Sequence, residues 1–231
     1  MTKEHILKIF DQDLNLLREE VQHLADQVKD ELERAMQALL NDDRELAREV
    51  VESDANADLM HQQINLRMTI VLARQQAMAE DLREILAAGR IATHLERMAD
   101  YAKNTAKRTQ VLGNKVDVEI GAQFKWMSDR VVAMLQQVIH AYRERDATEA
   151  NVAWSSDIEL DRMYGTLFAH LLEQMRRNPD TIKDATQFLF IAKGLERAGD
   201  HVTDIAEEVY LMVNGVPLQG PRPKVDNISP K

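Results

Sequence analysis

The sequence predicts an all-α protein built as two tandem, pseudo-symmetric three-helix bundles. All five prolines lie at Pro179 or later. Because proline in a helix interior costs about 3 kcal/mol, the preceding 178 residues can form long helices. Apolar residues near the N-terminus recur every three or four positions, the period of one buried helical face. They are Phe10, Leu14, Leu17, Val21, Leu24, Val28, Leu32, Met36 and Leu39. An internal repeat then divides the helices into two sets.

The first three predicted helices are separated by short polar turns. The first helix, from about Glu4 to Leu40, ends at an Asn-Asp-Asp turn. Either aspartate of that turn can cap the second helix, because aspartate accepts hydrogen bonds from the first free backbone N–H groups. The second helix runs to about Gln76, and a weak break follows around residues 79–80. The third then continues to Leu112, where Gly113 offers a C-cap.

Three further helices follow the same pattern. The fourth covers about Val118 to Arg143, and the fifth covers Asp146 to Arg177. The sharpest turn of the chain, Asn-Pro-Asp at 178–180, separates the fifth helix from the sixth. Proline suits the start of a helix, since its missing N–H has no partner there. The sixth helix ends at an Asn-Gly pair at 214–215, and the remainder has neither helical period nor apolar bulk.

Composition excludes several classes of protein. The chain has 231 residues, 39 acidic against 29 basic, and no cysteine. The absence of cysteine excludes disulfides, thiolate zinc sites and a cysteine nucleophile. The formal charge of −10 argues against binding to nucleic acid or insertion at an anionic membrane, because both require clustered Lys and Arg. The N-terminus lacks a signal-peptide pattern and apolar runs are too short to span a bilayer. We therefore expect a cytoplasmic protein.

Two halves of the sequence resemble each other. IATHLERMAD at 91–100 and IAKGLERAGD at 191–200 agree at six of ten positions. A second match, at an offset of 103, pairs Ser53, Asp54, Asp58 and Met60 with Ser156, Asp157, Asp161 and Met163. Since the order and the turns also correspond, we interpret the pattern as a duplication. It predicts one bundle over residues 1–113, a second over 114–215, and a flexible tail over 216–231.

Four acidic pairs at i, i+4 spacing occupy equivalent places in the two repeats. Residues at this spacing share one helix face, and like charges there destabilise the helix unless a cation lies between them. Hard metal cations prefer such oxygen ligands. With 39 acidic residues, chance alone gives about six or seven such pairs, so a solvated face neutralised by Arg97 and Arg197 remains the alternative. The candidate metal ligands are Asp54, Asp58, Glu96, Asp100, Asp157, Asp161, Glu196 and Asp200.

Other candidate residues carry less information. His61, His94 and His201 lie near these carboxylates in sequence, but no two occupy a shared repeat position, which favours exposed or capping roles. A ferritin-like di-metal enzyme requires an E-x-x-H sequence on two helices, and only Glu20/His23 fits. The sequence contains no phosphate-binding loop, dinucleotide fingerprint or zinc-protease motif. We therefore expect no catalytic residues and no organic cofactor.

Three segments carry a family resemblance: RQQAMAEDLREI at 74–85, IATHLERMADYAKNTAKR at 91–108 and FLFIAKGLERAGDHVTDIAEEVYLMVNG at 188–215. Together they resemble the PhoU family of bacterial phosphate-signalling regulators, over about residues 5–215. The resemblance implies a fold of two three-helix bundles and a cytoplasmic homodimer or higher oligomer. It also implies multinuclear iron or zinc clusters, with manganese as a further possible metal, on the four acidic pairs. One departure is that Tyr101 follows the first motif where His201 follows the second.

The function implied by this resemblance is negative regulation of phosphate uptake and of the phosphate-starvation response. By this resemblance, the protein would link the ATPase subunit of the phosphate ABC transporter (PstB-type) to a sensor histidine kinase (PhoR-type), as members of the PhoU family do. Two alternatives remain open at this point: a ferritin-like di-metal carboxylate protein or oxidase, and a metal-free helical adaptor with no connection to phosphate.

Overall fold

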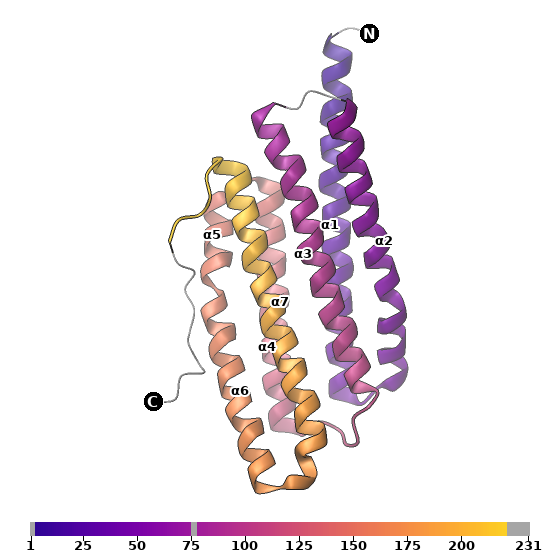
Figure 1. Cartoon of the computed structure of the whole chain (residues 1–231), viewed down its shortest axis with the longest axis vertical. Coiled ribbons are helices and arrows are strands. Elements are labelled where there is room, and N and C mark those ends of the chain that lie inside the picture. Colours follow the sequence, from indigo (N-terminus) through magenta and orange to yellow (C-terminus); the bar gives the residue numbers. More distant parts are fainter. Residues whose placement is uncertain (1–2, 75–77, 221–231) are drawn as a thin grey trace.

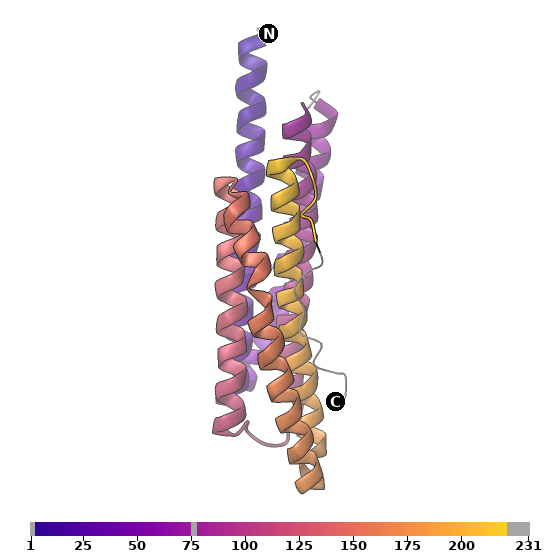
Figure 2. The ribbon, with the colours of Figure 1, turned by 90° about the vertical axis from the view of Figure 1, so that its left-hand side faces the viewer.

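The computed structural model describes residues 3–74 and 78–220, which form helices and connecting turns and contain no strand. The all-α prediction is confirmed. The helices run roughly along the long axis of the molecule, and the first turns of α1 extend beyond its neighbours (Figures 1 and 2). The elements are α1 (Lys3–Asn41), α2 (Arg44–Arg74), α3 (Ala79–Thr109), α4 (Val118–Glu144), α5 (Ala147–Ser155), α6 (Asp157–Arg177), the 3₁₀ helix η1 (Pro179–Thr181) and α7 (Ile182–Asn214).

Helices α1, α2 and α3 pack together as one group, and α4, α5, α6 and α7 form a second. The two groups meet where α3 lies beside α7 and where α1 lies beside α4 (Figure 1). Every member of the apolar stripe predicted along α1 is buried, from Phe10 to Leu39. One continuous set of buried apolar residues joins both groups. The bounds of two separate domains, 1–113 and 114–215, stay a prediction.

Aspartate and glycine residues cap several helix ends. Asp117 accepts a hydrogen bond from the Ile120 N–H at 2.9 Å at the start of α4. Asp146 accepts hydrogen bonds from two backbone N–H groups at the start of α5. Gly215 follows α7 with φ of 72°, a conformation that glycine adopts without steric cost. The predicted end of the last helix at 214–215 is confirmed.

Two predicted boundaries were wrong. The helix predicted over 146–177 is divided at Ser156, whose N–H donates to the Ala153 carbonyl at 3.2 Å in a tightened turn. Arg130 on α4 donates to the Ser156 carbonyl at 3.2 Å, so a neighbouring helix satisfies a carbonyl that the break releases. The third helix ends at Thr109 rather than 112. Gly113 does not serve as a left-handed C-cap, because its N–H instead donates to Asp184 on α7 at 2.9 Å.

The remaining expectations concern the chain ends and membranes. The predicted second helix reached Gln76, but residues 75–77 lie outside the described residues, as does the tail from 221 to 231. Residues 216–220 contain no helix. A search of the described helices finds none with a stretch long and apolar enough to cross a bilayer.

Candidate functional site

The eight predicted carboxylates lie on α2, α3, α6 and α7 and face the interior more than the solvent. Asp54, Asp157 and Asp161 are buried, with exposed fractions of 5%, 1% and 8%. The other five are half-buried. A charged side chain in such a place requires a compensating partner, since burial without one is costly. Asp54, Asp157 and Asp161 therefore do not belong to a solvated helix face, which was the alternative for these pairs.

In the first repeat, the protein supplies its own cation. The Lys103 ammonium on α3 donates to Asp54 on α2 and lies 3.5 Å from Asp100. The hydrogen bond to Asp54 raises the pKa of Lys103, so the lysine is charged at neutral pH. Arg97 lies 3.5 Å from Glu96 and 3.6 Å from Asp100. Lys103 thus occupies the position between two motif carboxylates where the sequence argument places a metal.

The second repeat differs at the equivalent position. Thr203, which aligns with Lys103 at the offset of 100, is fully buried and donates its hydroxyl to the Asp200 carbonyl at 2.7 Å. Lys193 pairs with Glu196 at 2.5 Å from its own helix. The Asp157 carboxylate lies against Gly199, where an added Cβ would be only 2.9 Å from Oδ1. The four acidic residues of this repeat offer the oxygen donors that hard cations prefer.

The structure also brings together two histidines that the sequence interpretation kept apart. His94 on α3 and His201 on α7 approach with their Nδ1 atoms 3.1 Å apart, at the contact between the two helix groups. Asp204 Oδ2 lies 3.6 Å from His94 Nδ1 and 3.5 Å from His201 Nδ1. Within the described part of the chain, these three residues form the group whose potential metal-ligand atoms all lie within 4.8 Å of one another. For His94 and His201, the expectation of exposed or capping roles was wrong.

Register explains why sequence comparison missed this cluster. In the repeat, position 94 corresponds to Gly194 and position 201 to Tyr101. Where α3 packs on α7, however, His94 contacts His201. Gly194 lies against the Tyr101 ring, so that a Cβ added to Gly194 would be 3.8 Å from the tyrosine Cδ1. Along the contact between α3 and α7, His94 therefore pairs with His201 and Tyr101 pairs with Gly194, which is the crosswise pairing that a twofold relation between the repeats requires. One indication of the cluster was present in the sequence: residues 94 and 201 lie on the third and sixth predicted helices, which the repeat relates to each other.

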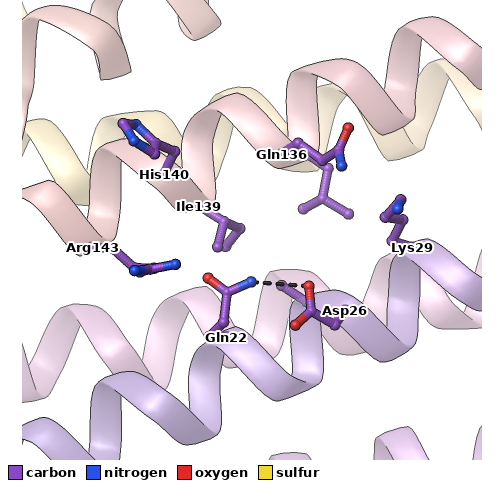
Figure 3. Close-up of a pocket in the computed structure, with 9 residues that line it drawn as sticks. Gln22, Asp26, Lys29, Gln136, Ile139, His140 and Arg143 are labelled. Carbon is purple, nitrogen blue, oxygen red and sulfur yellow. Dashed lines mark hydrogen bonds between the residues drawn. The ribbon is translucent and has the colours of Figure 1, made fainter.

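A hollow on the opposite contact, between α1 and α4, has a volume of about 210 Å³. It is lined by Gln22, Asp26 and Lys29 of α1 and by Gln136, Ile139, His140 and Arg143 of α4 (Figure 3). Gln22 donates to Asp26 at 2.9 Å along α1. The one acidic residue that lines the hollow, Asp26, lies on α1 near Lys29, whereas α4 contributes His140 and Arg143.

The residues of the ferritin-like alternative are engaged elsewhere. The Glu20 carboxylate is paired with Arg67 on α2 at 2.6 Å. His23 lines a surface hollow beside Arg143 and Glu144. A di-metal centre requires such residues to converge from several helices, and the convergent group in the described residues contains neither Glu20 nor His23.

Comparison with known proteins gives the same family from sequence and from structure. The PhoU domain matches the chain twice, at residues 21–109 and 124–209. The chain is 36% identical over 230 residues to the phosphate-specific transport system accessory protein PhoU homolog of Rhizobium meliloti, covering 99% of this chain and 97% of that protein. It is 31% identical over 209 residues to the homolog of the same name from Clostridium acetobutylicum, covering 90% and 95%.

Two crystal structures share the fold. PhoU from Pseudomonas aeruginosa superposes with a TM-score of 0.85 at 29% identity, covering 90% of this chain and all of that one. The phosphate transport system regulatory protein PhoU from Streptococcus pneumoniae superposes with a TM-score of 0.84 at 26% identity, covering 91% of this chain and 99% of that one. The similarity thus extends over both helix groups.

Proposed function

The chain belongs to the PhoU family, and from that premise we propose that it is an accessory protein of a phosphate-specific transport system. The observation that carries this proposal is the family match over both repeats, together with 36% identity over almost the whole chain to a protein of that name. A match restricted to one repeat would support only a shared helical module. Correspondence along the whole length supports a shared role for the assembled surface.

More specifically, we propose a negative regulator that links the transporter's ATPase subunit to a sensor histidine kinase. Such an adaptor needs no catalytic group, because binding one kinase conformation more tightly than another shifts the population between them. Its effect is limited by the difference in affinity. We propose accordingly that the protein is not an enzyme and acts in the cytoplasm as a homodimer or higher oligomer.

Exposed apolar side chains offer contact points for partners. Leu59 and Leu66 on α2 are 55% and 61% exposed, and a spacing of seven residues places them on one helix face. On the other helix group, Trp126 is 61% exposed beside a hollow lined by Met163. Large exposed apolar residues that gather on a surface are characteristic of interaction sites. Two such sites on different helix groups suit a protein that contacts two partners.

We further propose that iron, zinc or manganese binds through the acidic motifs, whose eight carboxylates offer the oxygen donors that hard cations prefer. In the first repeat such an ion would have to displace Lys103 from Asp54 and Asp100. Elemental analysis of the wild-type, Asp161→Asn and Asp58→Asn proteins tests this proposal. Loss of metal from either variant supports it, and a metal-free wild-type protein contradicts it.

A gene deletion tests the regulatory role. In high phosphate, the deletion strain should express phosphate-starvation genes, measured with a starvation-promoter reporter, and the wild-type gene should restore repression. A Trp126→Ala variant should restore less repression if this residue contacts a partner, while Trp154→Phe serves as the control, because Trp154 is buried. Unchanged reporter activity in the deletion strain would contradict negative regulation.

A further inference from the structure

We propose that His94, His201 and Asp204 form a binding site for a zinc-type transition-metal ion at the seam between α3 and α7. The site shares no residue with the four acidic motifs and does not rest on the proposed regulatory function. Its three ligand atoms come from two residues of α7 and one residue of α3. Imidazole nitrogen and carboxylate oxygen are both common zinc ligands.

The distances among the three ligand atoms match the size of a tetrahedral site. His94 Nδ1 and His201 Nδ1 are 3.1 Å apart, and Asp204 Oδ2 lies 3.6 Å and 3.5 Å from them. Ligands placed about 2.0–2.1 Å from a tetrahedral zinc ion lie about 3.3–3.4 Å from one another. The three atoms therefore outline one face of a tetrahedron of the required size, with little movement needed on binding.

The surroundings favour both access and orientation. The side chains of His94 and His201 are 23% and 20% exposed, and that of Asp204 is 42% exposed, so an ion can enter from solvent and keep water as its fourth ligand. The Tyr101 ring stacks on the His201 imidazole with centroids 5.8 Å apart. That contact limits rotation of the imidazole, and neighbours that orient a ligand strengthen a metal site.

The twofold relation of the seam predicts one such ion per chain. At the position related by the repeat, Gly194, Tyr101 and Asn104 take the places of His94, His201 and Asp204. A glycine, a phenol and an amide there replace the two imidazoles and the carboxylate. Because the ligands belong to different repeats, a bound ion would connect the two helix groups directly. Metal binding would then stabilise the contact between α3 and α7, since a ligand that binds only the native state raises its stability.

Zinc titration of chelator-treated protein, in competition with a chromophoric chelator, tests the proposal. We expect one histidine-dependent zinc ion per chain, and a visible Co²⁺ spectrum of tetrahedral intensity when cobalt replaces zinc. His94→Ala and His201→Ala should each weaken binding by more than about tenfold, because a direct ligand contributes at least as much as an outer-sphere partner. His140→Ala is the matched control, since His140 pairs with Glu149 on the surface.

Further arms separate this site from the acidic motifs. The Asp161→Asn protein should keep its histidine-dependent zinc, even if it loses metal from the second-repeat motif. Circular dichroism confirms folding of each variant, and His94→Gln provides a milder substitution if the alanine variant unfolds. Equal zinc affinity in the wild-type, His94→Ala and His201→Ala proteins would overturn the proposal, as would the absence of the tetrahedral cobalt spectrum. In either case the contact would be only an imidazole hydrogen bond.

Discussion

Glu84 links three parts of the structure, and its replacement tests how the helix groups hold together. Its carboxylate on α3 is 1% exposed and accepts hydrogen bonds from Arg18 on α1 and from Arg145, the latter at 3.0 Å. Arg145 follows α4 in a left-handed conformation with φ of 55°, which costs a non-glycine residue about 1–2 kcal/mol. The Glu84 carboxylate therefore stabilises both the α1–α3 contact and the turn after α4.

The magnitude follows from the burial of each partner. Removing one member of a buried ion pair costs about 3–5 kcal/mol when the remaining charge stays buried. Here the Arg18 and Arg145 side chains are 28% and 37% exposed, so water can solvate them, and a glutamine oxygen still accepts one hydrogen bond. We expect Glu84→Gln to lower the free energy of unfolding by about 2–3 kcal/mol. For a chain of this length that lowers Tm by about 5–10 °C.

The assay is thermal unfolding followed by circular dichroism at neutral pH, with Glu173→Gln as the matched control. Glu173 also has two arginine partners, Arg176 and Arg177, but all three lie on the surface of α6. Their hydrogen bonds lower the pKa of Glu173 to about 2, yet solvent screens such exposed pairs. We expect no measurable change in its Tm. Equal Tm values for Glu84→Gln and the control would refute the reasoning.

Four other substitutions have predicted signs. Gly199→Ala should lower Tm, because its Cβ would lie 2.2 Å from Leu160 Cδ2 and overpacking costs about 1–3 kcal/mol. Gly194→Ala should raise Tm, because its Cβ would lie 3.8 Å from the Tyr101 side chain and alanine has the higher helix propensity. Burial alone raises the pKa of Asp184, but hydrogen bonds from Gly113 and Asn114 outweigh it and lower that pKa below 3.8. This carboxylate's stabilisation is therefore present above about pH 4 and lost as pH falls through the lower folded pKa, so in urea unfolding the stability difference between wild type and Asp184→Asn should be full at pH 7 and shrink as pH falls below about 4. Lys103→Thr should bind one additional divalent metal ion by equilibrium dialysis, since it removes the ammonium that lies against Asp54 and Asp100; unchanged stoichiometry would contradict the role given to Lys103.

Local patterns in the sequence predicted the main elements because their causes are local. The stripe from Phe10 to Leu39 has the helical period, and every member is buried. The Asn-Gly pair ends α7 because glycine tolerates the left-handed conformation that follows. The interruption at Ser156 was missed because its released carbonyl bonds to Arg130, a partner on another helix. The early end of α3 likewise depends on Asp184, 71 residues from Gly113.

The candidate sites show the same division between local and long-range information. The repeat located the acidic motifs, and Arg97 contacts two of their carboxylates. The part played by Lys103 depends on how α2 packs on α3, which brings Asp54 to the lysine. The histidine cluster depends on the register of α3 against α7. No spacing within one helix encodes that register, so the sequence could supply the residues but not their convergence.

The measurement that tests the regulatory proposal most directly is co-purification from cells grown in high and in low phosphate. The tagged protein, expressed at its natural level, should retain the transporter's ATPase subunit and the sensor kinase, with more kinase retained in high phosphate. Two variants each remove one exposed apolar site: the double variant Leu59→Ser/Leu66→Ser and the single variant Trp126→Ser. Each variant should lose one partner and keep the other. Recovery of neither partner at either phosphate concentration would contradict the account of this protein as an adaptor.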